Sequence, residues 1–184
     1  MPTAKYAGYA EEALKPFTEK LCNEYYNSIE ILSNNAKRQA ERVTTLESET
    51  TASEYAQLCC AIIDDLKKHL NERKQKFIPY IHQLTEKAAA NHDCTACTGR
   101  CKLRHDMQVM ELNESNEAAK KVLHRLQLAT LPLYSQTRVP DEYRILRNRM
   151  AIIEMNMTEL FFLERSYLIP KVIDAQKTIN AGNS

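Results

Sequence analysis

The chain has 184 residues, which is long enough to bury the core of one domain. Three glycines and six prolines are few for this length, and they favour an all-helical protein. The 25 basic and 24 acidic residues give a formal net charge of +1, which argues against a nucleic-acid-binding protein. No apolar run approaches a membrane span, and residues 1–6 lack a secretory signal, so we expect a cytoplasmic protein.

A first helix is predicted from about Ala13, after a leader of residues 1–12 that has no periodic pattern. Apolar side chains recur along it at helical spacing: Leu14, Phe17, Leu21, Leu32, Ala36, Val43 and Leu46. Tyr25 and Ser28 are the polar residues on the same stripe. Both are therefore candidates for the interior of the fold.

A second helix is predicted to begin at Ser53, within a cluster of capping residues, and to end near residue 90. Its inward stripe reads Tyr55, Cys59, Ile62, Leu66, His69, Arg73, Phe77, Tyr80 and Leu84. His69 and Arg73 continue this stripe at steps of three and four residues. Both side chains are therefore predicted to point inward and not to solvent.

A third helix is predicted after the cysteine-rich residues 91–104, ending near Leu128. A fourth begins at Asp141, and its inward stripe reads Tyr143, Leu146, Met150, Ile153, Met157, Leu160, Glu164 and Tyr167. Four long helices with short links predict an all-α, antiparallel up-down-up-down four-helix bundle. We expect one such domain over residues 13–182, with a cysteine-rich connection at 91–105.

One pattern occurs twice, each time before a proline inside a predicted helix. The two segments are KKHLNERKQKFIP and TELFFLERSYLIP. Ten residues before the proline stand His69 in the first segment and Leu160 in the second. Six residues before it stand Arg73 and Glu164. Pro79 lacks a backbone donor and crowds the preceding turn, so a kink is predicted in the second helix.

These two segments resemble the motif of hemerythrin-like domains, and the resemblance covers residues 13–180. It is closest to the subgroup of di-iron proteins that repair iron–sulfur clusters. The resemblance implies an internal di-iron centre held by a histidine and a carboxylate from each segment. Here Arg73 takes the place of the first carboxylate and Leu160 that of the second histidine. Neither helix one at Glu24–Asn27 nor helix three at Glu111–Glu117 offers the further histidines.

A guanidinium cannot bind a metal ion, so a conventional di-iron centre is not expected. The resemblance instead implies that Arg73 faces Glu164 as a buried ion pair, with His69 and Tyr25 completing the hydrogen bonds. One alternative is that Arg73 extends its charged end to solvent. Another is a single metal ion held by His69, Glu164 and a glutamate of helix three, for which Glu114 is the candidate.

The cysteine-rich segment is a second candidate site. Cys94 and Cys97 form a CxxC pair, and Cys101 and His105 are four residues apart at the start of the third helix. Three thiolates and an imidazole are a suitable tetrahedral set for zinc. A redox-active Cys94/Cys97 pair and free thiols are the alternatives. The other cysteines are interpreted as packing residues: Cys22, Cys59 and Cys60.

Three functions are compatible with these residues. The favoured one is a degenerate hemerythrin-like protein, not an enzyme, that acts as a sensing or interaction module through an unidentified protein partner. The second is an active iron protein that handles oxygen or nitric oxide or repairs clusters with an unusual ligand set. The third is a plain structural bundle, for which a homodimer is the expected assembly. None of the three needs a nucleic acid or a membrane.

Overall fold

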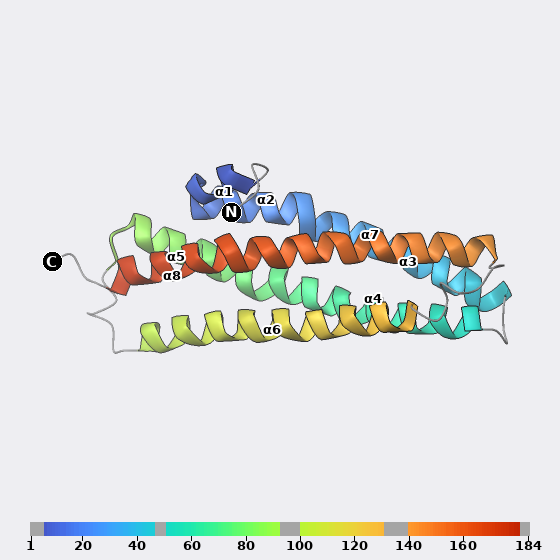
Figure 1. Cartoon of the computed structure of the whole chain (residues 1–184). Coiled ribbons are helices and arrows are strands. Elements are labelled where there is room, and N and C mark those ends of the chain that lie inside the picture. The colour runs from blue at the N-terminus through green and yellow to red at the C-terminus, as the bar shows by residue number, and fades with distance from the viewer. Residues whose placement is uncertain (1–5, 47–50, 93–99, 131–139, 181–184) are drawn as a thin grey trace.

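The computed structural model describes residues 6–46, 51–92, 100–130 and 140–180. In these residues the chain is all-α, with about four long helices packed against one another (Figure 1). Helix one consists of α2 (Leu14–Leu21), η2 (Cys22–Tyr26) and α3 (Asn27–Leu46). Helix two consists of α4 (Thr51–Glu72), η3 (Arg73–Phe77) and α5 (Ile78–Ala89). Helix three is α6 (Arg100–Thr130), and helix four consists of α7 (Asp141–Leu163), η6 (Glu164–Leu168) and α8 (Ile169–Asn180).

Successive helices run in opposite directions along a shared long axis, as the colours in Figure 1 show. Helix one packs against helices two and four, and helix three packs against the same two helices. The expected leader contains a short helix, α1 (Ala7–Glu11), beside the N-terminal part of helix one. None of the described helices is both long and apolar enough to cross a membrane.

Helices one, two and four each contain one π-helical turn. In η3 the Ile78 amide donates to the Arg73 carbonyl, and in η6 the Ile169 amide donates to the Glu164 carbonyl. Both η3 and η6 end two residues before the proline of their helix, Pro79 or Pro170. A proline has no amide proton, and its ring crowds the carbonyl of the preceding turn. The wider turn relieves this crowding, so the helix continues across the proline.

The inward stripes predicted for helices two and four are confirmed, because every residue of both stripes is buried. The stripe predicted for helix one is confirmed at Phe17, Leu21, Tyr25, Ala36 and Val43 but is wrong at Ser28 and Leu32, which are only partly buried. Its π turn adds a residue, which moves the buried face to Tyr26, Ile29 and Ser33. Leu46, predicted to be inward, is 65% exposed at the end of the helix.

Candidate functional site

A buried ion pair lies at the centre of the bundle. Arg73 Nε is 3.2 Å from Glu164 Oε1, and both side chains are 0% exposed. Each residue is the first of a π turn, one in helix two and one in helix four. The predicted contact between Arg73 and Glu164 is therefore present, and Arg73 does not extend to solvent.

The other two helices add hydrogen bonds to this pair. Tyr26 of helix one donates to Glu164 Oε1 at 2.7 Å. On helix three, Arg73 Nη2 donates to the Leu112 carbonyl at 3.2 Å and to the Asn116 side-chain oxygen. We call Tyr26, Arg73, Asn116 and Glu164 the core network. It draws one side chain from each long helix, so it fixes how all four are aligned.

An aromatic ring packs against the core network. The Arg73 guanidinium lies 4.7 Å from the centroid of the Phe77 ring, which is a favourable cation–π contact. Burial, followed by the negative charge of Glu164, raises the pKa of Tyr26 well above its usual value. The Tyr26 hydroxyl therefore stays protonated and serves as a hydrogen-bond donor.

The network leaves two charged atoms unpaired. Among the described residues, Arg73 Nη1 and Glu164 Oε2 have no hydrogen-bond partner although both atoms are buried. An unpaired polar atom in the interior destabilises the fold. The hydrogen bonds that the network does make must therefore offset both this loss and the cost of burying two charges.

Tyr25 does not take the role predicted for it. The side chain is 8% exposed, and burial, followed by a hydrogen bond to Glu159, raises the pKa of Tyr25. Glu159 also accepts a hydrogen bond from Tyr6 at 2.7 Å. Tyr25 thus belongs to a contact near the N-terminus, and the adjacent Tyr26 reaches Glu164 instead.

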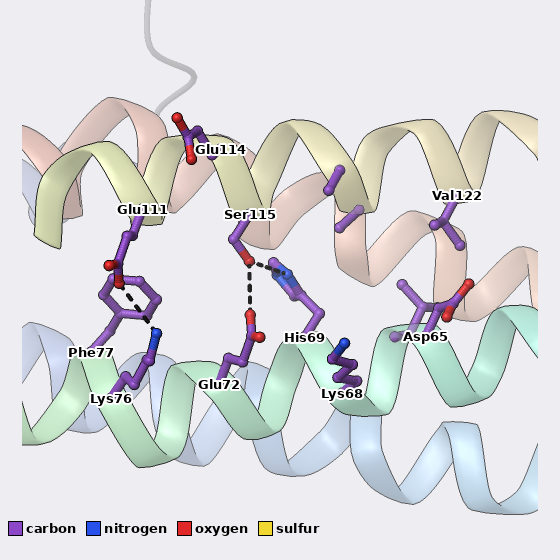
Figure 2. Close-up of a pocket in the computed structure, with 13 residues that line it drawn as sticks. Asp65, Lys68, His69, Glu72, Lys76, Phe77, Glu111, Glu114, Ser115 and Val122 are labelled. Carbon is purple, nitrogen blue, oxygen red and sulfur yellow. Dashed lines mark hydrogen bonds and ion pairs between the residues drawn. The ribbon is translucent and has the colours of Figure 1, made fainter. Parts of the chain in front are cut away.

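His69 also lies outside the core network, on the wall of a neighbouring pocket (Figure 2). Its Nδ1 is 3.0 Å from Ser115 Oγ, and Ser115 is 3.4 Å from Glu72 Oε2. Burial, followed by the positive charge of Arg73, lowers the pKa of His69 from 6.5 to about 3. The imidazole is therefore neutral near pH 7.

The pocket beside His69 has a volume of about 510 Å³ and lies between helices two and three. One end of it, on the left in Figure 2, is bridged by an ion pair of Lys76 with Glu111 at 3.3 Å. Glu114, predicted as a site residue, is exposed at the rim of this pocket and does not reach the core network. The sequence prediction missed Asn116, a polar residue one helical turn after Leu112 on the buried face of α6.

The residues at the centre do not fit a di-iron centre. Glu164 Oε1 already accepts hydrogen bonds from Tyr26 and Arg73, and Leu160 is fully buried without a donor atom. In the described part of the chain, no group of three or more His, Cys, Asp or Glu side chains could hold a metal ion. His69, Glu114 and Glu164 therefore do not converge as the single-metal alternative requires.

Only part of the cysteine-rich segment can be placed. Cys94 and Cys97 lie outside the described residues, while Cys101 and His105 occupy positions four residues apart in the first turns of α6. The remaining cysteines are free thiols, and Cys59 is buried in the core as predicted. Burial raises the pKa of Cys59 to about 12, so this thiol stays protonated.

No protein-family model matches the chain, and a comparison with curated proteins finds no match.

Proposed function

We propose that this chain is a hemerythrin-like bundle that has exchanged its di-iron centre for the core network and now acts as a non-catalytic sensing or interaction module. The observation that carries the proposal is the contact of Arg73 with Glu164 at 3.2 Å, with both side chains fully buried. The resemblance of the two proline-containing segments implies metal ligands at these two positions. A guanidinium supplies positive charge there but cannot bind a metal ion.

In this proposal, Arg73 replaces the positive charge that a metal ion would place beside Glu164. A carboxylate that once bound a cation still needs a positive partner when it is buried. Arg73 provides that partner from the facing helix, and Tyr26 donates a further hydrogen bond to the same oxygen. The bundle can therefore keep its helices aligned at this depth without a bound ion.

The core network supports a structural role more than a catalytic one. Arg73 and Glu164 are 0% exposed, and Tyr26 is 1% exposed. A substrate would have to separate two helices before it reached any of these groups. Catalytic groups need to approach the reacting atoms within hydrogen-bond distance, which this burial prevents.

The sensing element in this proposal is the connection between helices two and three. Cys94, Cys97, Cys101 and His105 offer three thiolates and an imidazole, a ligand set that suits zinc. Metal binding there requires deprotonated thiols, so both metal supply and thiol oxidation change its occupancy. A change in occupancy would alter the start of α6, because α6 contains both Cys101 and His105.

Elemental analysis of protein purified anaerobically without an affinity tag tests this function. We expect about one zinc per chain and no iron, with the zinc lost when Cys97 and Cys101 are both replaced by serine. Circular dichroism of that variant should still show the helical bundle. About two irons per chain would contradict the proposal, because they would require a working di-iron centre. Absence of both metals would contradict the zinc element.

A further inference from the structure

An apolar stripe lies on the outer face of α7. Its members are large hydrophobic residues that remain 40–65% exposed: Ile145, Ile152, Met155 and Phe162. The core-facing side of the same helix is already complete, with Leu146, Ile153 and Leu160 fully buried. The exposed stripe is therefore additional to what the bundle needs for its own core, and we call it the α7 stripe.

The α7 stripe has the spacing of a helix–helix seam. Its residues follow one another at intervals of seven, three and seven positions, which is the a and d pattern of a heptad repeat. The two other seam positions in this range hold Asn148 and Glu159. Residues with this period stay on one side of a helix that coils around another helix. A helix is therefore the partner that the stripe fits.

The seam is complementary to itself when two copies run antiparallel. A two-fold axis between Ile152 and Met155 places Ile152 opposite Met155 of the second copy. The same axis places Ile145 opposite Phe162, and Asn148 opposite Glu159. Apolar residues then face apolar residues, and an amide faces a carboxylate. A closed two-fold interface needs this kind of self-complementary patch.

Other arrangements pair these residues less well. A shift of one heptad in one direction brings Asn148 opposite Ile152, and in the other direction brings Met155 opposite Glu159. A parallel pair brings Glu159 against Glu159 of the second copy, and like charges repel. The antiparallel register centred between Ile152 and Met155 is the one that leaves no such mismatch.

We infer that the α7 stripe is the interface of a homodimer in which the two α7 helices pack antiparallel. The inference rests on the surface of α7 and not on the proposed function, so either can fail alone. The seam from Ile145 to Phe162 spans 18 residues, which is about 27 Å of helix. We expect a dimer that dissociates on dilution, because one helix from each copy makes a small interface.

The N-terminal segment covers only part of this end of the seam. Tyr6, next to α1, donates a hydrogen bond to Glu159 at 2.7 Å and packs against Phe162 with ring centroids 5.1 Å apart, yet Phe162 stays 40% exposed. At the opposite end of the seam Arg144 is paired with Asp141 at 2.7 Å. This ion pair partly neutralises the positive charge of Arg144 where it would approach the second copy.

Sedimentation equilibrium of the full chain at several concentrations tests the inference. The wild-type chain should show a monomer–dimer equilibrium, and Ile152→Glu should shift it to monomer while circular dichroism stays unchanged. Ile31→Glu is the matched control, because Ile31 is 61% exposed on α3 outside the α7 stripe and its replacement should leave the dimer intact. A monomeric wild-type chain, or a dimer that survives Ile152→Glu, overturns the inference.

Two substitutions at one position test the orientation of the helices. Asn148→Lys should strengthen the dimer, because each lysine would face Glu159 of the second copy, while Asn148→Glu should weaken it. Each change creates two symmetric charge pairs, so the dissociation constant should move roughly 2- to 30-fold in opposite directions. In a parallel dimer residue 148 faces its own copy, so both substitutions would weaken association. That result also overturns the antiparallel assignment.

Discussion

Arg73 and Glu164 are 91 residues apart in the chain, yet their Nε and Oε1 atoms lie 3.2 Å apart in a fully buried ion pair. Each residue begins a π turn and stands six residues before a proline, Pro79 in one helix and Pro170 in the other. The same local design, used twice, thus brings one charge of each sign to the same depth of the bundle. π turns often occur where a helix must place a particular side chain.

Replacing Tyr26 by phenylalanine should destabilise the bundle. The change removes the hydroxyl that donates to Glu164 at 2.7 Å, and a hydrogen bond to a buried charge contributes about 1.5–3 kcal/mol. Urea unfolding would measure this loss. Tyr25→Phe is the matched control, since Tyr25 interacts with the partly exposed Glu159 and its loss should cost about 1 kcal/mol or less. Equal losses in the two variants would contradict the assignment of Tyr26 to the core network.

The stability of the bundle should depend similarly on Asn116. Asn116→Ala removes an acceptor from Arg73 Nη2 and leaves that nitrogen with the Leu112 carbonyl alone. We expect a loss of about 1–3 kcal/mol in the free energy of unfolding. Asn113→Ala on the exposed side of the same helix should change stability by about 0.5 kcal/mol or less. If Asn113→Ala cost as much as Asn116→Ala, the loss would reflect helix three in general and not the core network.

His69 should make the protein sensitive to acid. Its pKa is about 3 in the folded chain and 6.5 when unperturbed, so below pH 6.5 the unfolded chain takes up a proton that the folded chain does not. The free energy of unfolding should therefore fall as the pH decreases, with a contribution from His69 of up to about 1.4 kcal/mol per pH unit. The contribution ends near pH 3, where the folded chain also binds the proton.

The contribution of His69 can be isolated by comparing variants between pH 4.5 and 7. His69→Gln should flatten the pH dependence measured by urea unfolding, whereas His124→Gln, on the exposed side of α6, should leave it close to that of the wild type. An unchanged slope in His69→Gln would show that His69 is protonated in the folded chain near its usual pKa.

The all-helical bundle and the inward positions of Arg73 and Glu164 could be predicted because they depend on local patterns, whereas the contact between the two was what the resemblance implied. The stripes of helices two and four have one period throughout, and all of their residues are buried. The two prolines supplied a common reference point, from which Arg73 and Glu164 could be compared position by position.

The partners of that pair could not be predicted, because each depends on geometry that the pattern does not contain. In helix one, the π turn Cys22–Tyr26 has no proline after it, so no sequence signal showed that the buried face moves from Tyr25 toward Tyr26. Helix three has no proline that fixes its register against the other helices, and the sequence pattern indicated Glu114 where Asn116 makes the contact.

A double-mutant cycle on Arg73 and Glu164 measures whether their ion pair holds the bundle together at the position where the resemblance implies metal. Arg73→Met and Glu164→Gln should each cost about 3–5 kcal/mol, because each leaves a buried group without its partner. The double variant should cost far less than the sum of the two.

The matched cycle uses an ion pair near the surface, Lys37 of helix one with Asp64 of helix two at 2.6 Å, and it should show little or no coupling because solvent screens both charges. All variants should be unfolded with and without a metal chelator. We predict strong coupling between Arg73 and Glu164, of the same size with and without the chelator, because this pair holds no metal ion. Additive effects of Arg73→Met and Glu164→Gln would contradict the central role of the pair.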